Sequence, residues 1–273
     1  SAGAWTEYDS DYLHKSLADS KFDSVNIYDC TSQWGVFSIA GPNSRSFLKK
    51  IVVSEDPDKT LSNKEFPWLS YRDIEIGMCP VRALRVAYTG ELGWELHHPI
   101  EMQNYLLDIL LSSGKEFNLK LVGARAQNWL RQEKSYKAFG SDLGRDAGPF
   151  ESKLSRFVDI NKNFLGKDAL LKRKTDVSCV TLLIDGPKDI DPWGREALYN
   201  ETEEVMLGRL TSAGYSVHFK KSIGLGYVKS SFSEVGTKLR IKIDDAFWNA
   251  EIVRDSPYAV SYTHLTLPTN SGV

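Results

Sequence analysis

Two glutamates that could bind or activate a ligand lie in the stretch AYTGELGWEL, residues 87–96. Glu91 and Glu95 are one helical turn apart, but Gly90 and Gly93 are interleaved with them. Each glycine costs a helix about 0.8–1 kcal/mol relative to alanine. Glu95 is therefore predicted to be held by non-helical backbone, which raises the question of what this carboxylate does between aromatic neighbours.

A second candidate is the segment GARAQNWLRQEKSYKAFGSDL, residues 123–143, which has a charged centre at residues 131–134. The simplest interpretation makes Glu133 and Lys134 a solvated face of a helix. The same interpretation assigns three residues to the core: Trp129, Leu130 and Phe139. Tyr136 lies seven residues after Trp129, nearly on the same helical face, and stays a candidate for the site.

Other familiar catalytic signatures are missing from the sequence. It contains no GxSxG elbow, Walker loop, HExxH motif or complete GxGxxG. IGLGYV has two glycines at dinucleotide-like spacing, but it lies among predicted strands and is expected to be a strand or turn. His97 and His98 are adjacent, so on a strand they point to opposite faces, one exposed and one half-buried. No metal site is predicted.

Composition narrows the functional class further. The chain has 273 residues and a net charge of −2, so it lacks the basic field that nucleic acid or an anionic membrane would require. No segment approaches the ~18 consecutive apolar residues of a membrane span. Cys30, Cys79 and Cys179 follow no metal-binding spacing, and are predicted to be buried reduced thiols. The start of the sequence resembles neither a signal nor a transit peptide, which favours the cytoplasm, or the mitochondrial matrix in a eukaryote.

The elements needed to position the candidate residues divide the chain in two. The first part mixes strands and helices: strands at 34–41 and 81–88, and helices from 42 through RSFLKKI, at 100–114, at about 121–138 and in FLGKDALLKRK. The second part reads as short strands: 178–185, 204–215, 222–228, 239–245 and 249–255. We therefore expect an α+β domain at 1–174 and a small β-barrel or sandwich at 175–258. Residues 259–273 match neither pattern, and are expected to be a non-native tail.

Several motifs resemble one known family. YTGELGWEL resembles the YTGE-x-G-aromatic-E pattern of the tetrahydrofolate-binding family of the glycine-cleavage aminomethyltransferase. IAGPNSR (39–45) resembles that family's strand–Gly-Pro–helix element. LRQEKSYKAFGSDL is similar to the branch found in dimethylglycine and sarcosine dehydrogenases, whose flavin half is fused to a folate half. Further similarity to the dimethylglycine type covers DPWGREALY (191–199), TSAGYSVHFKKSIGLGYV (211–228) and SEVGTKLRI (233–241). The resemblance implies a T-protein-like folate-binding domain followed by a small C-terminal β-barrel.

The resemblance also implies the roles of individual residues. Glu95 would accept a fork of hydrogen bonds from the pterin N–H and NH2 groups of tetrahydrofolate. Tyr88 and Tyr136 would line the pterin pocket, and glycines beside Tyr88 would let backbone approach a flat ligand. Arg125 matches the dehydrogenase-type spacing, whereas Gln127 stands where the free-standing enzyme carries an arginine. No catalytic residue is expected in this chain, because the family's acidic residue lies in a GGI-containing segment that would precede it.

The function implied is that of the tetrahydrofolate-binding portion of an FAD-dependent dimethylglycine or sarcosine dehydrogenase. FAD would lie in the preceding half of the parent enzyme, because this sequence has no FAD fingerprint. The partners would be folate and a small N-methyl amine, and the product 5,10-methylenetetrahydrofolate. Two alternatives remain: a free-standing aminomethyltransferase that acts on a lipoyl carrier, and a non-catalytic subunit of the pyruvate dehydrogenase phosphatase regulatory type.

Overall fold

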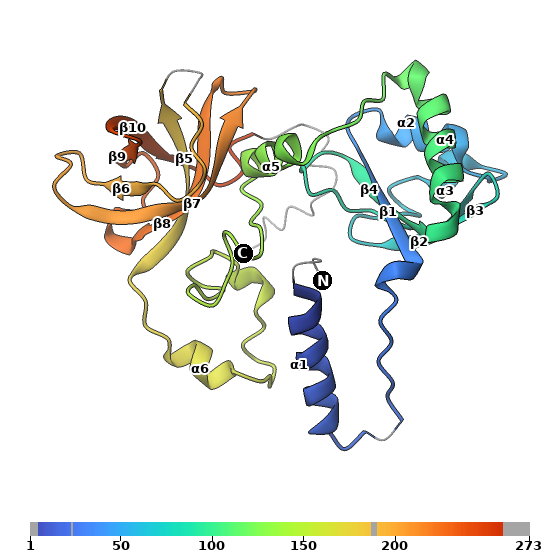
Figure 1. The fold of residues 1–273 in the computed structure, drawn as a ribbon, viewed down its shortest axis with the longest axis horizontal. Coiled ribbons are helices and arrows are strands. Elements are labelled where there is room, and N and C mark those ends of the chain that lie inside the picture. Colours follow the sequence, from blue (N-terminus) through green and yellow to red (C-terminus); the bar gives the residue numbers. More distant parts are fainter. Residues whose placement is uncertain (1–4, 23, 187–189, 259–273) are drawn as a thin grey trace.

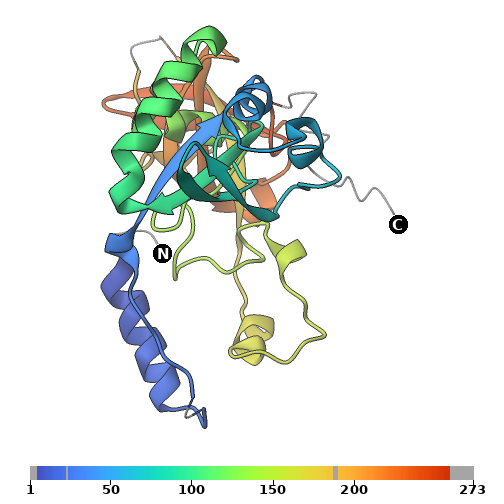
Figure 2. The same ribbon diagram turned by 90° about the vertical axis from the view of Figure 1, so that its right-hand side faces the viewer.

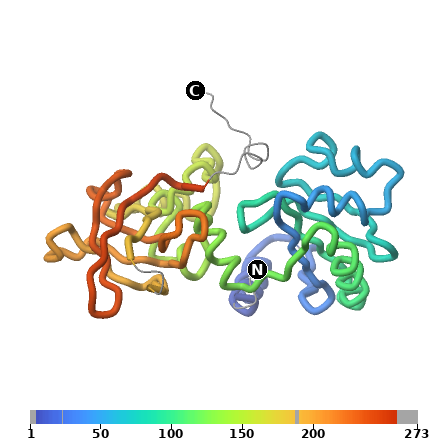
Figure 3. Tube along the Cα trace, turned by 90° about the horizontal axis from the view of Figure 1, so that it is seen from above, coloured from blue at the N-terminus to red at the C-terminus, as the bar shows by residue number. Residues whose placement is uncertain are grey.

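The computed structural model describes residues 5–22, 24–186 and 190–258. Its main body consists of two lobes with a helix between them. The first lobe is a four-stranded antiparallel sheet with helices on one face, and the second is a closed β-barrel. Helix α5 (Ala124–Glu133) lies between the lobes, as Figures 1 and 3 show. An α+β domain followed by a small closed barrel of six strands is the architecture that the sequence predicts.

The sheet has the strand order β1-β4-β3-β2. Its strands are β1 (Trp34–Ala40), β2 (Tyr71–Ile76), β3 (Cys79–Leu84) and β4 (Gly93–Pro99). Because β4 is a central strand, Glu95 is paired on both sides, with Ser38 of β1 and with Leu84 of β3. The register therefore places Glu95 in the middle of the sheet.

One face of the sheet is covered and the other is open. The covering helices are α2 (Ser44–Ile51), α3 (Pro57–Thr60) and α4 (Gln103–Gly114). Alternate strand residues supply the core beneath them: Ile39, Ile74, Ile76, Val81, Ala83, Trp94 and Leu96. Each fully buried aliphatic side chain contributes about 1.5–3 kcal/mol, so this face fixes the register. Glu95 is on the opposite, open face.

The barrel closes in the order β10-β5-β8-β7-β6-β9. Its strands are β5 (Val177–Asp185), β6 (Ala197–Tyr199), β7 (Met206–Ser216), β8 (Lys221–Lys229), β9 (Lys238–Ile243) and β10 (Ala246–Val253). Closure removes exposed strand edges. The interior is aliphatic, with Val180, Leu182, Ile184, Leu198, Leu210, Ile241 and Ile252 among its buried residues. The IGLGYV stretch lies in β8, so its prediction as strand is confirmed.

Two further helices lie at the periphery. α1 (Thr6–Ala18) buries none of its residues, and α6 (Lys167–Lys172) lies in the long connection to the barrel. Figure 2 shows both helices extending away from the sheet. The sequence did not predict α1, α3, β2, β4 or β6.

Two elements are shorter in the structure than the sequence predicts. The strand predicted at 81–88 ends at Leu84, because the chain turns there into the YTGE segment. The helix predicted at 121–138 spans only Ala124–Glu133, because Ser135 adopts a positive φ of 54° that ends it. Val122, which lies within the predicted helix, precedes α5 and is exposed.

Two other predictions can be compared with the described residues, and a third cannot. Cys79 and Cys179 are buried as predicted, but Cys30 is exposed because it lies in the extended approach to β1. No described helix is long and apolar enough to cross a membrane. The predicted non-native tail lies outside the described residues.

Candidate functional site

The YTGE segment is a tight turn that leads into β4. Gly90 has a φ of 74°, which only glycine adopts without strain. At Gly93, an added Cβ would lie 2.5 Å from the Ile39 carbonyl oxygen, so β4 and β1 could not pair this closely with any other residue. The two glycines that argued against a helix thus make the turn and begin the strand. Glu95 is on a strand, consistent with the predicted non-helical backbone.

Glu95 presents its carboxylate on the open face of the sheet. Its side chain is 35% exposed, and its Oε2 accepts a hydrogen bond from His97 Nε2 at 3.2 Å. The Glu95 carboxylate makes no other hydrogen bond with the described residues. The histidine pair lies on opposite faces as predicted, but His97 is half-buried and His98 fully buried, so the predicted exposed and half-buried pair is wrong in degree. Glu95 therefore keeps acceptor capacity for a ligand above the sheet.

The charged centre of the second segment is buried, which overturns the predicted solvated face. Arg131, Gln132, Glu133 and Lys134 are all at most 7% exposed, whereas Phe139 is 63% exposed. The cause is the barrel, which covers the end of α5 that a lone helix would present to water. Trp129 packs on β7, where an added Cβ at Gly214 would lie 2.0 Å from the indole ring. Phe139 instead meets the Trp5 ring edge-to-face.

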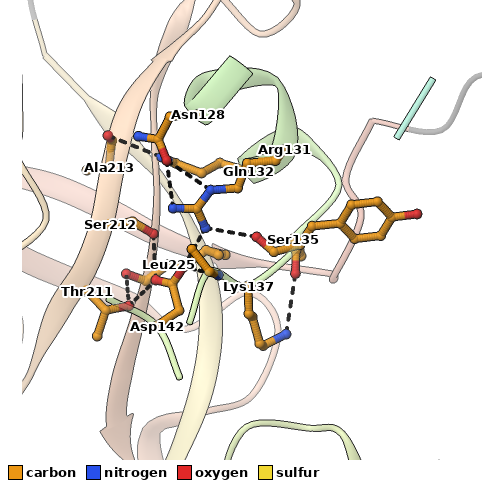
Figure 4. A network of polar contacts seen from close by, with 12 residues as sticks. Asn128, Arg131, Gln132, Ser135, Lys137, Asp142, Thr211, Ser212, Ala213 and Leu225 are labelled. Atoms are coloured by element: carbon orange, nitrogen blue, oxygen red, sulfur yellow. Dashed lines mark hydrogen bonds and ion pairs between the residues drawn. The ribbon is translucent and has the colours of Figure 1, made fainter. Parts of the chain in front are cut away.

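A buried ion pair lies at the centre of this junction (Figure 4). The Arg131 guanidinium bonds Asp142, and these side chains are 1% and 0% exposed. Arg131 Nε also donates to Asn128 Oδ1 at 3.0 Å, and Nη1 donates to the Tyr136 carbonyl at 2.8 Å. A buried pair is stable only when its remaining hydrogen-bonding groups are satisfied, and here most are.

Asp142 extends the network into the barrel. Its Oδ1 accepts hydrogen bonds from Ser212 Oγ at 2.6 Å and from the Thr211 hydroxyl, both on β7. Its Oδ2 accepts the Ala138 amide at 2.9 Å, and its carbonyl accepts Tyr227 Oη at 2.8 Å. The Asp142 carboxylate therefore joins α5, the following loop and β7, and its backbone carbonyl adds a contact with β8.

The two candidate tyrosines lie near this ion pair. Burial raises the pKa of Tyr88, and the charges of Arg131 and Asp142 act on it in opposite directions. Burial also raises the pKa of Tyr136, whose carbonyl binds Arg131. Both phenols are thus neutral hydrogen-bonding groups at neutral pH. Arg131 thus bonds the backbone carbonyl of Tyr136, and its charge acts on the Tyr88 phenol.

Arg125 makes no described contact with Tyr88, Tyr136 or Arg131. Its guanidinium is on the exposed start of α5, paired with Asp191 and 5.3 Å from the Trp129 ring centroid. It faces a barrel loop, so the structure does not bring it to Glu95.

The YTGE turn contacts the end of α5 directly. An added Cβ at Gly90 would lie 2.1 Å from Lys134 Cγ. Burial lowers the pKa of Lys134, and the Glu91 and Glu133 carboxylates oppose that shift. The two motifs singled out in the sequence therefore form one contiguous structure.

Gly90→Ala should lower the free energy of unfolding by about 1–3 kcal/mol, because the new side chain would be strained at positive φ and would displace Lys134. Urea denaturation measures the change. Gly144→Ala is the control, since its Cβ would meet nothing within 4 Å and its φ is ordinary. Equal stabilities for the two variants would contradict the close approach.

A cavity of about 580 Å³ lies beside this region but on the helical side of the sheet. Its lining includes Phe37 and Ile39 of β1, Leu110 of α4, and Glu91 and Gln127. Neither Glu95 nor Tyr88 lines it. The cavity thus reaches Ser38, the β1 partner of Glu95, but not the Glu95 side chain itself. No group of three or more potential metal ligands occurs in the parts of the chain that are described.

Comparison with known proteins agrees with this architecture. Residues 1–162 match the GCVT N-terminal domain, and residues 178–258 match the glycine cleavage T-protein C-terminal barrel domain. The aminomethyltransferase T of Bartonella henselae has a TM-score of 0.69 at 21% identity, covering 83% of this chain and 60% of that one. This likeness establishes the fold. The chain belongs to the glycine cleavage T-protein family.

Two groups of relatives are informative within that family. The mitochondrial dimethylglycine dehydrogenase of Mus musculus is 37% identical over 238 residues, which are 85% of this chain and 26% of that enzyme. The aminomethyltransferase of Caldanaerobacter subterraneus is 29% identical over 239 residues, covering 87% of this chain and 62% of that enzyme. The chain spans about a quarter of the length of the dimethylglycine dehydrogenases it matches.

Proposed function

We propose that this chain is the tetrahydrofolate-binding portion of an FAD-dependent dimethylglycine or sarcosine dehydrogenase-type enzyme. It would hold the folate that receives the oxidised N-methyl carbon, to give 5,10-methylenetetrahydrofolate. The observation that carries the proposal is the partly exposed Glu95 carboxylate, which lies within the family's YTGE motif on the open face of the sheet. Membership of the T-protein family supports it.

The residues present fit a pterin ring. A pterin offers an N–H and an NH2 side by side, and an ionised carboxylate accepts both in paired hydrogen bonds. Glu95 has no arginine or lysine partner among the described residues, so its oxygens are available for such a fork. Tyr88 is 36% exposed and adjoins the same strand, where its ring would line the pocket.

Tyr136 and Arg125 complete the proposed site less directly. Tyr136 would reach the ligand from the loop that Arg131 holds. Arg125 would have to leave Asp191 to contact folate.

Arg125→Ala is expected to weaken folate binding by no more than about fivefold, because an exposed ion contributes about 0.2–1 kcal/mol. Calorimetric titration of this variant beside the parent chain measures the loss. A loss of a hundredfold or more would mean that Arg125 is a principal ligand.

Bound tetrahydrofolate would itself supply the nitrogen that captures the one-carbon unit. The contribution of this chain would be to hold and orient that cofactor, rather than to provide a nucleophile. The identity pattern favours the dehydrogenase type, since three dimethylglycine dehydrogenases are 34–37% identical to the chain and the aminomethyltransferases 28–29%.

The domain boundary and location form part of the same proposal. We place the boundary near Lys174, between the end of α6 and the start of β5. The location would be the mitochondrial matrix in a eukaryote, as in the names of the dehydrogenase relatives, and the cytoplasm otherwise.

Calorimetric titration of the purified chain with 5-formyltetrahydrofolate, a reduced folate that resists oxidation, tests the proposal. We expect one site per chain with an affinity in the micromolar range, about −8 kcal/mol. Absence of binding by a chain with a cooperative unfolding transition would contradict it. Transfer from an aminomethylated lipoyl carrier to the bound folate would favour the free-standing transferase instead.

A further inference from the structure

We propose that His97 is the positioning residue that orients the Glu95 carboxylate for its ligand. This inference rests on the proposed function, because it assigns a role to a neighbour of the pterin-binding group. His97 is two residues after Glu95 on β4, so both side chains leave the same, open face of the sheet. Nothing in the YTGE motif itself specifies a histidine there.

The contact between the two side chains defines which atom carries the proton. Glu95 Oε2 and His97 Nε2 are 3.2 Å apart, and an ionised carboxylate can only accept. Nε2 must therefore donate, which requires the Nε2–H tautomer or the protonated ring. The bond engages Oε2, whereas Oε1 accepts no hydrogen bond from the described residues.

The other charged groups on this face are arranged so that they do not compete for Glu95. Arg82 of β3 is directly across from His97. Its guanidinium is taken by Asp73 of β2, with Nε and Nη2 at 2.8 and 3.2 Å from the two carboxylate oxygens. Arg82 also lies over the Tyr71 ring, 5.3 Å from its centroid. From β1, the residues opposite are the uncharged Val36 and Ser38.

The consequence is a carboxylate restrained by a single imidazole N–H rather than held in a fork by a guanidinium. An arginine partner would occupy both oxygens in a fork and would have to be displaced by the ligand. A single histidine bond restricts the carboxylate's rotation and leaves most of its acceptor sites open. Removing His97 should then weaken folate binding only because the Glu95 carboxylate is no longer held in place.

A double-mutant cycle tests this dependence, with 5-formyltetrahydrofolate affinity as the readout. His97→Leu should weaken binding about 3–10-fold, the size of a partly exposed hydrogen bond to a charged group. His97→Gln should restore affinity to within about twofold, because its amide N–H lies near the position of Nε2. In the Glu95→Gln background, His97→Leu should have no further effect. His14→Leu, on exposed α1, is the matched control and should bind like the parent.

Two results separate failure of this inference from failure of the proposed function. If Glu95→Gln weakens binding and His97→Leu does not, or if the two losses multiply, His97 is not a positioning residue. If Glu95→Gln leaves affinity unchanged, the pterin site itself is wrong, and the inference falls with it. A ligand-free nuclear magnetic resonance spectrum of the histidine nitrogens gives an independent check. We expect the Nε2 proton on His97, and a neutral ring protonated at Nδ1 would overturn the proposal.

Discussion

Asp142→Ala should lower the free energy of unfolding by about 3–5 kcal/mol, the loss expected when one partner of a buried ion pair is removed. The substitution leaves the Arg131 guanidinium buried at 1% exposure without its counter-charge. It also leaves the Ser212 and Thr211 hydroxyls without their acceptor. Asp142→Asn should cost nearly as much, because it keeps the shape but removes the charge. Urea denaturation followed by circular dichroism measures both.

Asp73→Ala is the matched control for this experiment. Asp73 also bonds an arginine in a fork, but its side chain is 63% exposed, so its removal should cost no more than about 1 kcal/mol. If the two aspartates proved equivalent, the junction between α5 and the barrel would not depend on the Arg131–Asp142 pair.

Glu95→Gln should weaken binding of 5-formyltetrahydrofolate by about 10–100-fold. The amide removes the negative charge and replaces one acceptor with a donor that faces the pterin N–H groups, a loss of about 1.5–3 kcal/mol. The free energy of unfolding should be nearly unchanged, because the side chain is partly exposed and makes no ion pair with arginine or lysine among the described residues. Calorimetric titration measures the affinity.

Glu75→Gln serves as its control. Glu75 is an exposed glutamate on the same open face, carried by the edge strand β2 rather than by β4. The same chemical change there should leave folate affinity within about twofold of the parent. Equal losses at both positions would mean that the net charge of the face, rather than the Glu95 carboxylate, attracts the ligand.

Local pattern predicted two of the four sheet strands, β1 and β3, but neither β2 nor β4, the strand that carries Glu95. WGVFSIAG alternates and ends at Gly41-Pro42, and the structure has β1 followed by α2. The two glycines beside Glu95 ruled out a helix, and the structure places Glu95 on β4. These predictions succeeded because hydrophobic alternation and glycine geometry act over a few residues.

The buried centre of the 123–143 segment could not be predicted in the same way. Charged residues are usually exposed to solvent, so Arg131 and Glu133 are predicted to lie on the surface unless their buried partners are known. Those partners lie outside the helix: Asp142 on the following loop pairs with Arg131, and Ser216 on β7 donates to Glu133. One feature of the sequence could have indicated this burial. Four polar residues follow Trp129 and Leu130 directly, so the end of the helix has no apolar side chains and can pack only through polar contacts.

The distance between Glu95 and the pterin ring in a crystal structure of the chain with 5-formyltetrahydrofolate tests the central claim most directly. The account predicts the pterin on the open face of the sheet, with its N–H and NH2 groups about 2.8 Å from the two Glu95 oxygens. Tyr88 should contact the ring, and His97 should keep its bond to Oε2. A folate bound instead in the cavity of about 580 Å³ on the helical side, away from Glu95, would contradict it.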